Sequence, residues 1–159
     1  MKTASIIIVL LVVAVILAAR WGAFSGRQPD TLGLRDGKLK PPSKTPNSVS
    51  SQAGLWPDHP QREAAAIAPL APQGDSAATM AKLAQIIESM EDARIVERRP
   101  DYLYAQFTTK LMRFVDDAEF WFDPAAGVVQ VRSASRVGRK DFGVNRARIE
   151  TIRARLAGA

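Results

Sequence analysis

The residues best suited to chemistry lie between positions 132 and 146, together with two aspartates upstream. Arginine can hold a carboxylate or phosphate through two parallel hydrogen bonds. Glycines at positions 138 and 143 permit positive φ angles and a close approach of the backbone to a ligand. We therefore predict a ligand-binding cluster made of Asp116, Asp117, Arg132, Ser133, Ser135, Arg136, Asp141, Asn145 and Arg146.

Three interpretations of this cluster are open: an internal network of ion pairs, a site for an anion or lipid headgroup, and a catalytic site. A serine nucleophile at Ser133 or Ser135 needs a base beside it, and the single histidine, His59, lies in a proline-rich stretch. Asp116 and Asp117 are adjacent on a predicted strand, so their side chains point to opposite faces unless a bulge intervenes. A shared cation or proton between them is therefore disfavoured.

The composition excludes several classes of site. The chain has 159 residues, no cysteine and one histidine, which rules out disulfides, thiolate metal sites, a cysteine nucleophile and a multi-histidine zinc site. No phosphate loop, dinucleotide fingerprint or zinc signature is present. We expect no metal and no cofactor, and we favour a binding module over an enzyme.

The positive charge is concentrated near the carboxyl terminus. The net charge of the chain is +6, and residues 132–159 contain eight arginines and lysines against two acidic residues. A basic surface of this kind attracts phosphates, carboxylates or an anionic partner. Aromatic residues make up only 7% of the chain, so an aromatic platform for nucleic acid is not expected. A domain outside the cytoplasm would also meet little nucleic acid, so no nucleic-acid partner is expected.

The amino-terminal segment is apolar enough to enter a membrane. Fourteen consecutive apolar residues run from Ile6 to Ala19, and the uncharged stretch between Lys2 and Arg20 spans about 25 Å as a helix. We predict a transmembrane anchor over residues 4–24, which places the lipid bilayer among the partners. A cleaved signal peptide and a buried core helix are the alternatives. Ala18 and Ala19 run directly into Arg20, which suits a cleavage site poorly.

A basic segment rich in proline and glycine follows the anchor. Residues 25–51 contain four prolines, which remove donors from helices and strands alike. We predict a solvated tether; a basic strip resting on anionic headgroups is the alternative.

Residues 52–159 show the pattern of an α+β domain. A short strand is expected at 64–68, and Ser76 and Asn145 are placed as N-caps of two amphipathic helices. Between them, alternating polar and apolar residues predict about four strands with one packed face and one face that is polar or wet. The expected fold is therefore a small antiparallel sheet flanked by two helices and preceded by one transmembrane helix.

Three blocks of sequence carry a resemblance: 46–51, 114–120 and 131–146. On these blocks the chain is similar to the family called domain of unknown function 1499, over about residues 31–156. Members of that family often have cysteine at the position of Ser48 and a bulkier apolar residue at that of Ala118. The resemblance implies no established activity, substrate or catalytic residue.

Together these observations predict a membrane-anchored extracytoplasmic domain, associated with the cell envelope in a periplasm-like compartment. A short amino-terminal tail before a single span favours this orientation. The function expected is non-enzymatic binding of an anionic ligand or an envelope protein through a basic surface. The alternative is a hydrolase-like enzyme that uses Asp116, Asp117 and the Ser133–Arg146 segment.

Overall fold

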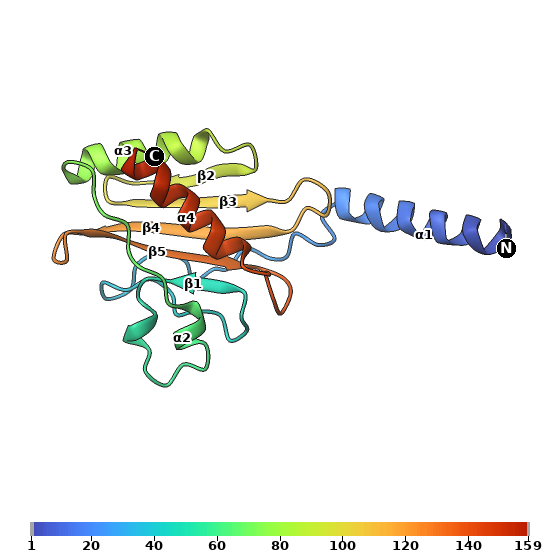
Figure 1. Ribbon diagram of the computed structural model, residues 1–159, viewed down its shortest axis with the longest axis horizontal. Coiled ribbons are helices and arrows are strands. Elements are labelled where there is room, and N and C mark those ends of the chain that lie inside the picture. The colour runs from blue at the N-terminus through green and yellow to red at the C-terminus, as the bar shows by residue number, and fades with distance from the viewer. Residues whose placement is uncertain (1, 159) are drawn as a thin grey trace.

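A five-stranded antiparallel sheet organises the chain, and one helix projects from its end (Figure 1). The structure is a computed structural model that describes residues 2–158. The helices are α1 (Lys2–Arg20), α2 (Arg62–Ala65), α3 (Ser76–Glu88) and α4 (Val144–Ala157), with a 3-10 turn at Ala53–Leu55. The strands are β1 (Ser48–Ser50), β2 (Ala93–Arg98), β3 (Tyr102–Thr108), β4 (Val115–Asp123) and β5 (Val128–Ser135), arranged in the order β1-β5-β4-β3-β2. The predicted α+β class is confirmed, with five strands in place of about four.

Helices α3 and α4 pack on one face of the sheet, which we call the helical face (Figure 1). On β3 the alternating residues Leu103, Ala105 and Phe107 point to this face, as the pattern predicts. Phe120 lies opposite Leu103 on β4, and both side chains are fully buried. Burial of each large apolar side chain contributes about 1.5–3 kcal/mol, so this layer forms the main core.

Residues 27–46, which we call the cover segment, lie on the other face of the sheet. Leu39 is 1% exposed and packs with Tyr102, Tyr104 and Trp121 of that face. The backbone N–H of Gly33 donates to a Glu119 carboxylate oxygen at 2.7 Å. We call this second face the covered face.

The prediction of a solvated tether over residues 25–51 is therefore wrong in structural terms. The prolines do prevent long strands, but Leu39 is buried against the sheet and Leu32 and Leu34 pack beside it, partly buried. Residues 48–50 of the same predicted tether form β1. The second face is polar, as expected, but it is not exposed to solvent, because the cover segment lies on it. Tyr104 is 2% exposed and Glu119 is fully buried, although both alternate with the core residues.

Several element boundaries differ from the expected ones. Asp75 caps α3, because its Oδ1 accepts from the N–H of Ala78 at 2.8 Å. Gly143, with φ 83°, precedes α4, while the Asn145 side chain turns into the interior. The strand expected at 64–68 is absent: the segment instead contains the end of α2 and an isolated bridge.

Helix α1 is long and apolar enough to cross a membrane, and it extends away from the domain (Figure 1). Its end is joined to the domain by packing. Ala19 is fully buried, and the Phe24 and Phe114 rings lie 5.7 Å apart. The helix therefore leaves the domain at the end of the sheet where the β3–β4 connection lies.

Candidate functional site

The predicted cluster is divided between the two faces of the sheet. Asp116 and Asp117 are neighbours on β4, so their side chains point in opposite directions. Asp116 pairs with Arg148 of α4, whereas Asp117 pairs with Arg136 on the covered face. The pairing of β4 with β5 runs in register from Asp116 to Asp123, so no bulge there brings the two carboxylates together.

Asp116 and Ser133 belong to a buried polar network on the helical face. Arg148 Nη2 donates to Asp116 Oδ2 at 2.7 Å, and Arg148 Nη1 donates to Asn145 Oδ1 at 2.8 Å. Ser133 Oγ donates to the same amide oxygen at 2.5 Å. The Arg148 guanidinium also lies 4.4 Å from the centre of the Phe107 ring. Among the described residues the Ser133 hydroxyl contacts only Asn145 and Arg148, and neither can serve as its general base.

Asn145 is the centre of a joint that holds the connection between β5 and α4. Its Nδ2 donates to Asp141 Oδ2 at 3.0 Å, to Ser135 Oγ at 3.1 Å and to the carbonyl oxygen of Asn47 at 3.2 Å. Asn47 Nδ2 donates in turn to the carbonyl oxygen of Gly138 at 2.8 Å. Two sequence blocks far apart in the chain, 46–51 and 131–146, are therefore locked together here.

The Asp141 carboxylate stabilises the same joint. It accepts from the backbone N–H groups of Gly143 and Asn145. Burial alone raises the pKa of Asp141, but the hydrogen bonds from Asn145 and Gly143 outweigh this effect and hold the pKa below its usual value. Asp141 is thus an ionised acceptor within the fold.

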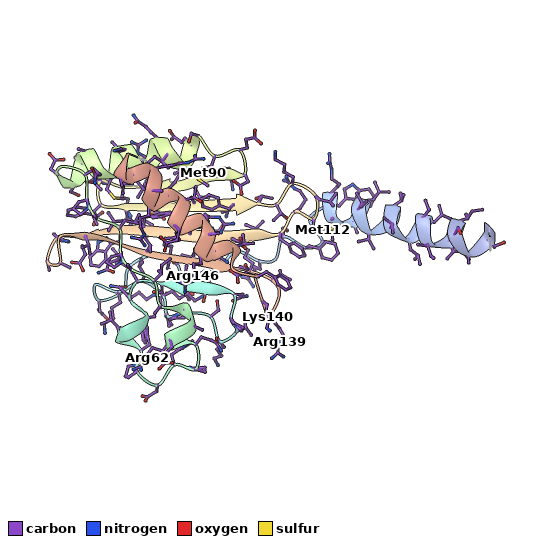
Figure 2. All side chains as sticks on the ribbon, in the orientation of Figure 1. Arg62, Met90, Met112, Arg139, Lys140 and Arg146 are labelled. Atoms are coloured by element: carbon purple, nitrogen blue, oxygen red, sulfur yellow. The ribbon has the colours of Figure 1, made fainter. Side chains whose placement is uncertain are left out.

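Arg146 lies near the start of α4 (Figure 2), and its side chain bonds to a segment outside the predicted cluster. Its Nη2 donates to the carbonyl oxygens of Ala64 and Ala66 at 3.0 and 2.9 Å. This contact ties α4 to the segment that follows α2.

On the covered face, Asp117 and Arg136 form a bidentate ion pair. Arg136 Nε and Nη2 donate to the two Asp117 oxygens at 2.8 and 2.7 Å. Tyr104 Oη donates to Asp117 Oδ1 at 2.5 Å. Burial, followed by the hydrogen bond to Asp117, raises the pKa of Tyr104 to about 12, and the same carboxylate raises the pKa of Arg136. At neutral pH the tyrosine is therefore a donor and the arginine a cation.

Glu119 and Arg132 form a looser buried pair next to it. Arg132 Nη1 lies 3.7 Å from Glu119 Oε2, and Arg132 Nε donates to the Pro41 carbonyl oxygen at 3.1 Å. Among the described residues, neither Nη of Arg132 has a hydrogen-bond partner, and Glu119 Oε2 also has none. Burial raises the pKa of Glu119 and lowers that of Arg132. This pair thus keeps unused hydrogen-bonding capacity in the interior.

A pocket of about 420 Å³ lies between the cover segment and this face, and we call it the basic pocket. The residues that line it are Arg27, Pro29, Lys40, Pro41, Pro42, Ser43, Lys44, His59, Asp117, Arg132, Ala134, Ser135 and Arg136. Five of them are cationic, and a single carboxylate, already paired, faces them. Low-dielectric walls with an excess of one sign of charge concentrate the field in the space that they enclose.

Four ionisable residues of this pocket were not predicted as site residues from the sequence: Arg27, Lys40, Lys44 and His59. Three of them belong to the segment that was interpreted as a tether. Their side chains make no hydrogen bond or ion pair within residues 2–158, whereas His59 Nδ1 accepts from the N–H of Gln61 at 3.1 Å. With Nδ1 as acceptor, a neutral His59 carries its proton on Nε2. The basic residues scattered among the prolines were the available signal.

These elements define an α+β protein with one apolar amino-terminal helix and a basic pocket beneath an ordered cover segment. The chain belongs to the family described as protein of unknown function DUF1499, whose model matches residues 38–156. The resemblance inferred from the three sequence blocks is thereby confirmed. Comparison with curated proteins and with solved structures gives no significant match.

Proposed function

We propose that this protein is a membrane-anchored binding module that holds a small anion in the basic pocket. The observation that supports this most is the gathering of five cationic side chains around one space. Two of them, Arg136 and Arg132, have a carboxylate partner, and the other three have none among the described residues. The ligand class is a small molecule that carries phosphate or carboxylate groups. A pocket of about 420 Å³ is within the size range of small-molecule sites, roughly 300–1,000 Å³.

Arg132 supplies the most favourable donors for such a ligand. It is 4% exposed, and its Nη groups have no hydrogen-bond partner among the described residues. Glu119 balances its charge at 3.7 Å without a hydrogen bond. An anion in the pocket would supply the charge-assisted hydrogen bonds that Arg132 lacks. Lys40, Lys44 and Arg27 add positive charge to the lining of the pocket.

The anchor and the orientation belong to the same proposal. Helix α1 would cross the bilayer once and hold the domain at the surface, on the extracytoplasmic side of a cell envelope. A protein of the envelope is the other class of partner that a basic surface fits.

The hydrolase alternative has less support. Ser133 is fully buried on the helical face, while His59 lines a pocket on the covered face. Asp116 and Asp117 also contact different arginines on different faces. A catalytic group would have to be found within the basic pocket itself.

Thermal unfolding of the full chain in detergent micelles tests the binding proposal. Inorganic phosphate, a sugar phosphate and a sugar acid are titrated, with sodium chloride as the control for ionic strength. A ligand at a hundredfold excess over Kd stabilises the native state by ~2.7 kcal/mol, which appears as a higher midpoint. Lys44→Ala should reduce this shift, whereas Arg98→Ala, which removes an exposed cation on β2, should leave it unchanged.

A cooperative transition that no anion shifts would contradict the proposal and point to a protein partner. The orientation is tested separately with Ala126→Cys, which places the only cysteine of the chain on the exposed β4–β5 turn. A membrane-impermeant maleimide should label this variant in intact cells. Labelling only after lysis would place the domain in the cytoplasm.

A further inference from the structure

Two loops lie at the end of the sheet from which α1 projects (Figure 1). The β3–β4 loop spans residues 109–114 and the connection from β5 to α4 spans residues 136–143. Figure 2 places Met112 in the first loop, and Arg139 and Lys140 at the tip of the second. We call residues 109–114 and 137–143 the α1-side loops.

These loops expose large apolar side chains. Phe142 is 94% exposed and Leu111 is 61% exposed, and Trp21, just after α1, is 89% exposed. Elsewhere on the domain, the large apolar side chains that the structure describes are at most 49% exposed, at Leu55. An aromatic and a leucine held in water beside an apolar helix suit the interface of a bilayer.

Two residues of these loops have an unfavourable backbone conformation. Arg113 has φ 59° and Phe142 has φ 53°, and they are two of the three described non-glycine residues with positive φ. An aromatic residue rarely adopts this conformation, and glycine or asparagine would do so at lower cost. Strain of this kind is concentrated at functional positions. The fold therefore presents these two side chains outward in spite of a local energetic cost.

Unpaired positive charge surrounds the apolar side chains. Within residues 2–158, no ion pair or side-chain hydrogen bond is made by Arg20, Arg113, Arg139 or Lys140. A cleft of about 450 Å³ between the end of α1 and the sheet is lined by Arg20, Arg94 and Arg113 among others. If α1 crosses a bilayer, cations beside its end would lie near the phosphate groups of the lipids.

The attachment of α1 determines what these loops would touch. Phe24 packs on Phe114, which follows Arg113 in the β3–β4 loop. Gly26 lies against Arg136 and Val137, so closely that an added Cβ would come within 2.8 Å of both. Both loops are thus fixed near the point where the helix enters the domain. A bilayer crossed by α1 would meet this end of the domain first.

We propose that the α1-side loops dock on the bilayer that α1 spans. Phe142 and Leu111 enter the interfacial region, and Arg113, Arg139 and Lys140 bind anionic headgroups. This proposal rests on the anchor in the proposed function but not on the ligand of the basic pocket. Docking would hold the domain in one orientation over the membrane surface.

The lack of cysteine in the chain permits a direct test with single-cysteine variants of the full chain. Phe142→Cys, Val12→Cys and Ala126→Cys are labelled with an environment-sensitive fluorophore and reconstituted in vesicles of phosphatidylcholine and phosphatidylglycerol that carry a lipid-borne quencher. Val12 reports insertion of α1, and Ala126 is the matched control on the β4–β5 turn. We expect strong quenching at positions 12 and 142, and at least a severalfold smaller effect at position 126.

Each outcome of the test has a separate meaning. Quenching at position 12 with none at position 142 would overturn docking while the anchor stands, and no quenching at position 12 would overturn both. In the Phe142→Cys background, Arg139→Glu with Lys140→Glu should weaken quenching in these vesicles. Equal quenching with and without phosphatidylglycerol would overturn the role of anionic headgroups.

Discussion

Replacement of Arg136 by alanine should destabilise the domain by removing one half of a buried ion pair. The Arg136 and Asp117 side chains are 8% and 2% exposed, and two hydrogen bonds of 2.8 and 2.7 Å join them. In the variant, Asp117 keeps Tyr104 Oη as a donor but loses its counter-charge. Breaking a buried pair from one side costs about 3–5 kcal/mol. Because the guanidinium borders the basic pocket and water can replace part of it, we expect the lower end, about 3 kcal/mol.

The measurement is urea unfolding of the full chain in detergent micelles at neutral pH, followed by tryptophan fluorescence. Arg136→Ala combined with Asp117→Asn should be less destabilised than Arg136→Ala alone, because no charge is left unpaired in the interior. Lys44→Ala, at the exposed rim of the same pocket, should change the stability by about 0.5 kcal/mol or less. A loss below about 1 kcal/mol for Arg136→Ala, with no recovery in the double variant, would refute the reasoning.

Three further predictions concern the joint around Asn145, the connection between α1 and the cover segment, and the cover segment itself. Because the pKa of Asp141 is held below its ordinary 3.8, its ionised form stabilises the native state above that value, and this stabilisation is lost as the pH falls through the lowered pKa. The stability difference between wild type and Asp141→Asn should therefore shrink on acidification, and a pH-independent difference in denaturant unfolding would contradict this. Gly26→Ala should loosen the connection between α1 and the cover segment, because the new Cβ would lie 2.7 Å from a Val137 methyl group. The measurement is the rate of tryptic cleavage after Arg27, which should rise. The matched control is Gly37→Ala, which has the similar φ of 68° and nothing within 4 Å, and equal cleavage in both variants would reject the steric explanation. Leu39→Ala should cost about 2–5 kcal/mol in thermal or urea unfolding, because Leu39 is 1% exposed, whereas a negligible loss would mean that the cover segment is held by other contacts.

The local pattern of the sequence predicted the helical face correctly. Strict alternation along β3 and β4 indicated which residues are buried beneath α3 and α4, because side chains alternate between the faces of every strand. The same rule predicted that Asp116 and Asp117 would diverge, as they do. The apolar run before Arg20 likewise predicted a helix able to cross a membrane, because its length and composition are local properties.

Contacts between segments far apart in the chain could not be predicted from local sequence patterns. Prolines in residues 25–51 indicate irregular backbone, but irregular backbone can lie in solvent or pack on a sheet, and only the fold shows that Leu39 packs on Tyr102 and Tyr104. The alternation of β3 likewise identifies a polar face without showing whether another segment covers it. The basic pocket exists because the cover segment returns over that face.

The class of the fold, the family and the apolar helix could all be predicted from the sequence alone, since each depends on neighbouring residues or on the spacing of motifs along the chain. The tertiary structure decided which arginine meets which carboxylate. It pairs Asp116, Asp117 and Glu119 with Arg148, Arg136 and Arg132, respectively. Lys110 of the β3–β4 loop pairs with Glu91, whereas within residues 2–158 Lys40 and Lys44 of the cover segment and Arg113, Arg139 and Lys140 of the α1-side loops make no ion pair. Charge pairing depends on register and on chain reversal, so composition could predict a basic protein but could not locate its basic surfaces.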